Sequence, residues 1–312
     1  MTQHRPNPLP RGLLYAVMLG LFIIWSNSFH AIAYFRTRLA VSTTALVTLR
    51  YGFAAIFCVP YCLIRWREVR QLLARDGWRV VAMGSLMVSG YNFALNWAQG
   101  RVPPATASLI ITMNPVFTFL LAVPFLGERA SWMKILGLGV AFLGVYGLVH
   151  TQQRSFGSGY ELYALVLLLA PLSWALATVL GKPITGRCDP LLLTFTATGI
   201  GSLPFLITLL AGTGGVHPLL RHLSWVGWAA LLHLAVLCTI IGFAVWFWAL
   251  RHTAASSVAA FVFLNPPLTS IFGALWRTES FHWSTALFGA IILGGVALGS
   301  GIWNRAPIMP AD

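Results

Sequence analysis

The stretch PPATASLIITMNPVFTFLLAVPFLGE, residues 103–128, is the most informative part of the chain for its architecture. It is almost wholly apolar and carries no charge before Glu128. A bilayer core about 30 Å thick is crossed by roughly 20 apolar residues of helix, so the stretch predicts a transmembrane helix. Near its middle, Pro115 removes a backbone donor and leaves the carbonyl of Ile111 without its helical partner. Within a membrane, protein or cavity water must satisfy that carbonyl, so we expect the broken point to face inward; the alternative is a plain proline kink.

The same pattern returns 151 residues later, in WALRHTAASSVAAFVFLNPPLTSIFGALWRTE at residues 248–279. At this fixed offset Asn114 and Pro115 align with Asn265 and Pro266, and no gap is needed. The matches predict an internal repeat, with one half in residues 1–152 and the other in residues 153–312. Proline-broken hydrophobic segments at matching positions of two repeats indicate a transporter site between the repeats.

The composition is that of a membrane protein. Of the 312 residues, 58% are hydrophobic and 9% are charged, and the mean hydropathy is +0.78. Soluble domains carry about 25% charged residues. The net charge of +13 would suggest nucleic-acid binding in a soluble protein. In a membrane protein it records topology, because Lys and Arg collect in cytoplasmic loops. We therefore expect the chain to meet a lipid bilayer and no nucleic acid.

The hydrophobic runs predict an all-α protein with ten membrane spans. Placing the N-terminus inside puts most loop Lys and Arg residues on the cytoplasmic side, so both termini are expected there. Because five spans per half is an odd number, the two similar halves are expected to be inverted around a central cavity. The predicted spans are 12–35, 43–64, 79–99, 102–126, 132–150, 161–181, 190–211, 225–250, 253–276 and 283–303, with the larger loops at 65–78, 151–160 and 211–224.

Glycine is dense in the predicted fifth and tenth spans, residues 132–150 and 283–303. Small residues let membrane helices approach closely. We expect these spans to pack tightly, either between the two halves or between two copies of the chain. The second alternative predicts a homodimer.

Neutral polar and aromatic side chains at middle depth are the candidate substrate-binding residues. Amides and hydroxyls line a cavity without the desolvation cost of a charge, and aromatic walls suit an amphipathic solute. The alternative for each is packing or an interhelical hydrogen bond, worth about 1 kcal/mol. The substrate-site candidates are Trp25, Asn27, Tyr91, Asn92, Thr112, Asn114, Trp174, His233, Trp246 and Asn265, and the candidate hinges are Pro115 and Pro266.

Arg50 is the one lysine or arginine set well inside a predicted span, away from its ends. Its guanidinium is expected either to reach the outer interface or to face inward and pair with a substrate carboxylate, a geometry that arginine suits. The seven acidic residues all fall in loops, tails or span ends. Because intramembrane carboxylates are the usual proton and ion relays, the sequence predicts a facilitator or a coupling route without them. No metal-binding or acid–base motif stands out, so no metal, cofactor or enzyme activity is expected.

The run ASLIITMNPVFTFLLAVPFLGE at 107–128 and its echo at 257–279 resemble the EamA family of the drug/metabolite transporter superfamily. Arg50-Tyr51 resembles the Arg-aromatic pair in the second span of that family, whereas in the second half Thr-Glu replaces the Gly-Glu that ends the motif. The resemblance covers most of the chain. It implies a bacterial inner-membrane exporter of small metabolites, and the narrower similarity is to the bacterial exporter of aromatic and other neutral amino acids.

Together these expectations describe an exporter of aromatic and other neutral amino acids that works by alternating access. Export of drugs, nucleosides or other metabolites is the alternative within the same class. A membrane-embedded enzyme acting on lipid is the alternative from another class, and product formation by the purified protein would support it. A scaffold role would leave the inverted repeat unexplained.

Overall fold

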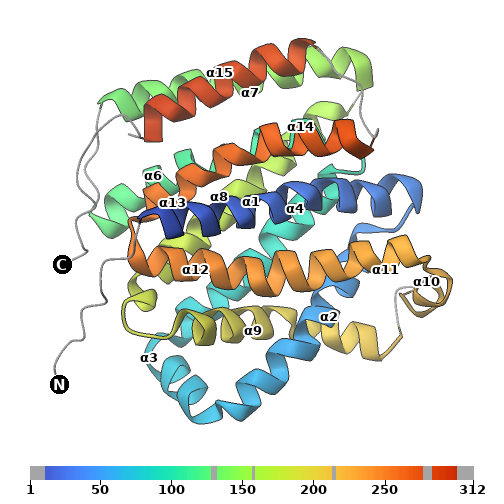
Figure 1. Cartoon of the computed structure of the whole chain (residues 1–312), viewed down its shortest axis with the longest axis vertical. Coiled ribbons are helices and arrows are strands. Elements are labelled where there is room, and N and C mark those ends of the chain that lie inside the picture. The colour runs from blue at the N-terminus through green and yellow to red at the C-terminus, as the bar shows by residue number, and fades with distance from the viewer. Residues whose placement is uncertain (1–10, 128–131, 157–158, 213–215, 277–282, 301–312) are drawn as a thin grey trace.

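The computed structural model describes residues 11–127, 132–156, 159–212, 216–276 and 283–300, which form helices and short connections with no strand among them. Figure 1 shows most of the long helices side by side, running across the view in a roughly common direction. In chain order the elements are α1 (Arg11–Ala33), η1 (Tyr34–Arg38), α2 (Thr43–Ile64), α3 (Trp66–Gly84), η2 (Ser85–Gly90), α4 (Tyr91–Ala98), α5 (Pro104–Ile111), α6 (Asn114–Leu126), α7 (Trp132–Phe156), α8 (Tyr160–Thr185), α9 (Pro190–Leu210), α10 (Val216–His222), α11 (Trp225–Leu232), η3 (His233–Ile241), α12 (Gly242–His252), α13 (Ala255–Ala260), η4 (Phe261–Leu264), α14 (Asn265–Trp276) and α15 (Trp283–Ser300).

Seven helical stretches of the described residues are long and apolar enough to cross a membrane. They correspond to seven of the ten predicted spans, so the prediction of an all-helical, multi-pass membrane protein is confirmed. The stretches are Gly12–Arg38, Thr43–Ile64, Pro104–Leu126, Tyr160–Thr185, Pro190–Leu210, Trp225–His252 and Ala255–Trp276. The predicted spans 132–150 and 283–303 coincide with α7 and α15, whose apolar stretches are shorter, Ile135–Leu148 and Ala286–Gly295.

The predicted loop at residues 65–78 is wrong, because α3 already begins at Trp66. Its residues Val69, Leu72 and Val80 are buried while its arginines lie outside, so this is an amphipathic helix rather than a loop. The helix kinks at Asp76, which has φ −129°, and continues through η2 into α4. The predicted loops at 151–160 and 211–224 are also shorter than expected, since α7 extends to Phe156 and α10 occupies Val216–His222.

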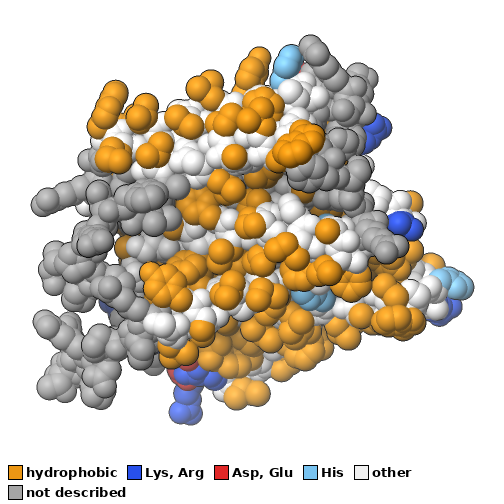
Figure 2. Space-filling view, turned by 45° about the horizontal axis from the view of Figure 1, so that its top comes forward, with side chains coloured by type: hydrophobic (Ala, Val, Ile, Leu, Met, Phe, Trp, Pro, Cys, Tyr) orange, Lys and Arg blue, Asp and Glu red, His pale blue; other side chains and the backbone are white. Residues whose placement is uncertain are grey.

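Apolar side chains cover much of the face of the molecule that Figure 2 shows. Leu143, Tyr146 and Leu165 are each more than 60% exposed. A soluble monomer would not leave apolar patches of this extent in water. This exposed surface is suited to lipid, and Lys and Arg lie at the margins of the visible face (Figure 2).

Contacts between helices distant in the sequence hold the bundle together. Helix α2 packs against α9, α1 against α14, α6 against α8, and α7 against α15. The last pair lies side by side along one margin of the molecule (Figure 1). The backbones of α3 and α9 touch at Gly84 and Gly201, where any added Cβ would meet a carbonyl oxygen of the other helix within 2.5 Å.

The two Asn-Pro segments are broken in the same place. Helix α5 ends at Ile111, and α6 begins at Asn114. In between, the amides of Thr112 and Met113 bond three residues back, at 3.1 Å each, as in a 3₁₀ turn. In the second half the 3₁₀ segment η4 lies directly before Asn265, where α14 begins. The sequence thus locates both helix breaks correctly.

Candidate functional site

A cluster of four aromatic side chains lies where α1, α8 and α12 meet. Trp25 of α1 contacts Trp174 of α8 with ring centroids 5.4 Å apart, and Trp246 of α12 with centroids 5.6 Å apart. Phe243 packs on Trp174 at 4.8 Å. Phe243 and Trp246 are three residues apart, so α12 presents both on one face. The Trp25 indole donates to the carbonyl of Cys238 at 2.9 Å, which fixes its orientation.

Arg50 of α2 is buried beside this cluster, with 4% of its surface exposed. Its Nε donates to Thr239 Oγ1 and its Nη1 donates to Asn92 Oδ1, both at 2.9 Å. The amide nitrogen of Asn92 in turn donates to the hydroxyl of Tyr51 and to the carbonyl of Met87, so Asn92 cannot rotate freely. Of the two alternatives for Arg50, the structure therefore has the side chain facing inward.

The two residues that accept hydrogen bonds from Arg50 lie in or next to π-helical segments. Thr239 lies in the π-helical η3, and Asn92 stands two residues after the π-helical η2. Such turns occur mostly as local bulges in helices and are frequent at functional sites. Here they set the two side-chain oxygens that fix the direction of the guanidinium.

The broken helices bring two asparagines to the same region. Asn114 is buried and donates to the carbonyl of Pro171 on α8 at 3.2 Å. Asn265 is also buried, and its Oδ1 accepts from the hydroxyl of Ser26 on α1 at 3.0 Å. Each asparagine thus ties the start of one half-helix to a helix of the other half of the chain.

These groups enclose a narrow pocket with a free volume of about 30 Å³. That volume holds one or two water molecules. A larger solute needs the walls to move apart. The pocket is lined by Trp25, Ser28, Phe29, Arg50, Tyr91, Leu95, Ile111, Asn114, Trp174, Phe243, Val262 and Asn265.

Six predicted residues line this pocket: Trp25, Arg50, Tyr91, Asn114, Trp174 and Asn265. Asn92 and Trp246 stand directly behind it, Asn92 on Arg50 and Trp246 on Trp25 and Trp174. The inward-facing break is also in place, since Ile111 and Asn114 are both lining residues.

The other three candidates also lie outside the pocket lining. Asn27 lies on another face of α1, because the lining residues Trp25, Ser28 and Phe29 follow the three- and four-residue helical spacing that excludes position 27. The hydroxyl of Thr112 donates to the carbonyl of Leu109. The ring of His233 bonds to the carbonyl of Ile24 at 3.1 Å.

Six lining residues were not among the candidates: Ser28, Phe29, Leu95, Ile111, Phe243 and Val262. Only Ser28 is polar, so most of them do not stand out in an apolar span. The spacing of Trp25, Ser28 and Phe29 on α1, and that of Tyr91 and Leu95 on α4, could have identified three of them.

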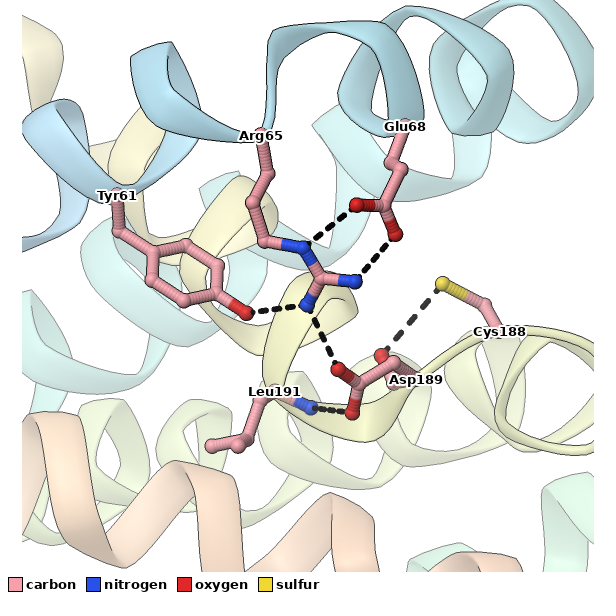
Figure 3. A network of polar contacts seen from close by, with 6 residues as sticks. All are labelled: Tyr61, Arg65, Glu68, Cys188, Asp189 and Leu191. Atoms are coloured by element: carbon pink, nitrogen blue, oxygen red, sulfur yellow. Dashed lines mark hydrogen bonds and ion pairs between the residues drawn. The ribbon is translucent and has the colours of Figure 1, made fainter.

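A cluster of ion pairs lies away from the pocket, where α2 and α3 meet the connection between α8 and α9 (Figure 3). Arg65 bonds to Tyr61 at 2.7 Å, to Asp189 at 2.9 Å and to Glu68. These bonds raise the pKa of Arg65 above its ordinary value. The other oxygen of Asp189 caps α9 by accepting from the amide of Leu191.

A second ion-pair group joins the same two segments. Asp76, buried at the kink of α3, lies 3.4 Å from Arg79 and 3.5 Å from Arg187 in the α8–α9 connection. Asp76 was placed in a loop by the sequence, and it is instead a buried helical residue. The two groups, Arg65 with Asp189 and Asp76 with Arg187, are called the ionic clasp below.

Comparison with known proteins identifies the chain. The model of the EamA-like transporter family matches residues 11–150 and again residues 161–301. The chain belongs to the EamA-like transporter family. It is therefore a membrane transporter, as the motif at 107–128 predicts.

Several relatives of similar length carry transporter names. A probable terminal-alkyne amino-acid exporter of Streptantibioticus cattleyicolor is 30% identical, over 91% of this chain and 92% of the relative. An uncharacterized transporter of Archaeoglobus fulgidus is 28% identical, over 90% of this chain and 96% of the relative. The uncharacterized inner membrane transporter YedA of Escherichia coli K12 is 21% identical, over 95% and 94%. A crystal structure with 21% identity superposes with a TM-score of 0.63 and covers 95% of this chain and all of that one, which shows a shared fold.

Within the EamA-like fold, the described residues contain no group of three or more His, Cys, Asp and Glu side chains that could hold a metal ion. The pocket is lined by neutral side chains and one cation. This arrangement is suited to binding a solute. The aromatic rings offer contact area, the amides offer hydrogen bonds, and Arg50 offers a positive charge.

Proposed function

We propose that the protein exports aromatic and other neutral amino acids across the bacterial inner membrane by alternating access. The observation that carries the proposal is the pocket itself, which Arg50 and the rings of Trp25 and Trp174 line together with the starts of two broken helices. A zwitterionic aromatic amino acid has a carboxylate for the guanidinium and a ring for the indoles. A relative named as a probable amino-acid exporter supports the same substrate class.

We further propose ten spans arranged as two inverted halves, residues 1–152 and 153–312. The helix contacts support this, because α1 packs on α14 while α6 packs on α8, which is the exchange that a two-fold relation between the halves requires. The π-helical segments support it too, since η2 shifted by 151 residues falls within η3. The third span would be the apolar end of α3 with η2 and α4.

Substrate passage requires the 30 Å³ pocket to widen. Pro115 and Pro266 stand at the second residue of α6 and α14, directly after the breaks, and we propose that the half-helices bend there. The ionic clasp joins residues of the first half to the α8–α9 connection of the second. Opening of that end would separate these pairs.

The orientation follows the distribution of basic residues. Both termini are placed in the cytoplasm, and the ionic clasp then lies at the cytoplasmic end together with the exposed arginines of α3. Because no carboxylate is among the described residues that line the pocket, transport down the substrate gradient is proposed rather than proton coupling. Clear acceleration by an imposed proton gradient, at a fixed substrate gradient, would contradict that part.

Counterflow in proteoliposomes tests the proposal. Vesicles are loaded with unlabelled phenylalanine, threonine, methionine, lysine or uridine, and the entry of radiolabelled phenylalanine is followed. Accumulation driven by the neutral and aromatic amino acids, but not by lysine or uridine, is expected. Failure of every amino acid, with protein that elutes as a single folded species, would refute the amino-acid proposal and favour another metabolite.

The hinge role of the prolines has its own test. Pro115→Ala, and Pro266→Ala combined with Pro267→Ala because Pro267 would otherwise keep the second helix broken, are expected to slow counterflow, singly and more strongly together, since a continuous helix resists the bend. Pro60→Ala is the matched control, because Pro60 also lies within a membrane helix, α2, but not in the pocket lining. Normal rates for both hinge variants would refute the hinge role alone.

A further inference from the structure

We infer that the pocket holds its solute by the carboxylate and does not require the amino group, so that aromatic monocarboxylates without an amine are a second class of substrate. The inference rests on the proposed function, because it concerns the same pocket. It starts from the charge balance around Arg50.

The positive charge of Arg50 has no counter-ion among the described residues. Its two hydrogen bonds end on neutral oxygens, those of Thr239 and Asn92. A guanidinium carries five N–H donors, so three of them have no acceptor within the described part of the protein. The ion pairs of that part all belong to other arginines, Arg65, Arg75, Arg79 and Arg187.

A buried charge is costly unless it is paired, so this side chain favours an anion arriving in the pocket. The remaining donors belong to one planar group that lines the pocket. A carboxylate matches that plane and accepts two parallel hydrogen bonds. Phosphate esters are larger and carry two charges, whereas a monocarboxylate neutralises the single charge of Arg50.

The pocket has fewer groups that could bind an ammonium than groups that could bind a carboxylate. No acidic residue is among the lining residues. The side-chain oxygen of Asn265 already accepts from Ser26 at 3.0 Å, and that of Asn114 lies 3.5 Å from the hydroxyl of Thr118. The indole faces of Trp25 and Trp174 can attract a cation, but Arg50 repels it at short range. The amino group of an amino acid is therefore tolerated rather than required.

Three ligands with the same phenyl ring separate the contributions of the two charged groups. L-phenylalanine has both groups, 3-phenylpropionate has only the carboxylate, and phenethylamine has only the ammonium. Each is added in increasing concentration against counterflow of radiolabelled phenylalanine, and its direct binding to purified protein is measured by calorimetry. We expect 3-phenylpropionate to compete within about threefold of phenylalanine, and phenethylamine to be weaker by at least about tenfold.

Variants at Arg50 link this selectivity to the guanidinium. Arg50→Gln is expected to weaken 3-phenylpropionate by at least about tenfold, and Arg50→Lys is expected to recover part of the loss because it keeps the charge. Arg70→Gln is the control, since Arg70 is exposed on α3 and does not line the pocket. If Arg50→Gln does not fold, the three-ligand comparison on the unchanged protein decides the inference.

Equal competition by phenethylamine and 3-phenylpropionate, in protein that transports phenylalanine, would overturn the inference and leave the proposed function standing. Absence of all amino-acid counterflow by folded protein would refute the proposed function instead. In that case the calorimetric order of the three ligands still decides the inference, because binding does not depend on transport.

Discussion

Replacing Gly242 with alanine is expected to displace the central indole of the pocket. Gly242 lies at the start of α12, and an added Cβ would lie 2.4 Å from Trp25 Nε1 and 3.0 Å from Trp25 Cε2. Non-bonded carbon atoms are at their best separation at about 3.5–4.0 Å, so the indole must retreat by about 1 Å. Its hydrogen bond to Cys238, 2.9 Å long, would then stretch beyond hydrogen-bonding range.

The expected loss of stability follows from the broken hydrogen bond between Trp25 and Cys238. An indole donor left without a partner in a mostly buried place costs about 1–3 kcal/mol. Alanine in place of glycine within a helix returns up to about 1 kcal/mol. The net loss of about 1–2 kcal/mol corresponds to a roughly 5- to 30-fold lower ratio of folded to unfolded protein, and the displaced indole is expected to weaken the binding of any solute that contacts Trp25.

The assay is counterflow over a range of phenylalanine concentrations, together with the thermal unfolding midpoint of the purified variant. Gly20→Ala is the control, because Gly20 lies on α1, the helix of Trp25, and an added Cβ there meets nothing within 4 Å. We expect a raised KM and a lowered midpoint for Gly242→Ala only. If both variants match the unchanged protein in KM and midpoint, Trp25 does not hold the pocket in the way described.

Three further predictions concern the rest of the bundle. Gly84→Ala should separate α3 from α9 and lower the unfolding midpoint, at a cost of about 1–3 kcal/mol, whereas Gly77→Ala in the same helix has open space and should not. Arg65→Asp should slow counterflow by loosening the ionic clasp, and adding Asp189→Arg should recover the rate; no recovery would show that the pair is not a clasp. With the other three cysteines replaced by serine, Cys188 should react slowly with maleimide at pH 7, because burial and Asp189 raise the pKa of its thiol. Its rate should increase as the pH rises and should be lower still in Arg65→Asp, because the positive charge of Arg65 lowers the pKa of this thiol; a fast, pH-independent rate would contradict the described surroundings.

The membrane helices could be predicted because hydrophobic length alone decides them. The seven long apolar helices coincide with predicted spans within a few residues. The first part of α3, residues 66–78, was missed because its hydrophobic residues form only one stripe among arginines, which is the pattern of a helix half in contact with protein and not of a span. The third predicted span, 79–99, carries serine, glycine and asparagine, and the asparagine at position 92 is the one that holds Arg50.

The sequence could predict which residues lie at the depth of the pocket in the membrane, but not which of their side chains point into it. Trp25, Asn114 and Asn265 were identified because polar and aromatic groups are conspicuous in an apolar span. Asn27 has the same depth as Trp25, but it points elsewhere, and in α1 apolar residues surround the helix so evenly that no face stands out. The pairing of Arg65 with Asp189 joins residues far apart in the sequence, and no local pattern predicts such a contact.

The contact of α7 with α15 has a consequence for how the protein is made. Gly144 of α7 lies directly against Ile292 of α15, and Gly147 against Phe288. The ribosome finishes α7 about 130 residues before it starts α15. At roughly 5–20 residues per second that interval is about 6–26 s. Until α15 has been synthesised, the glycine face of α7 contacts lipid or the insertion machinery instead of α15. A chain that stops before α15 leaves that face uncovered, so the insertion of α15 is the step that buries the glycine face of α7.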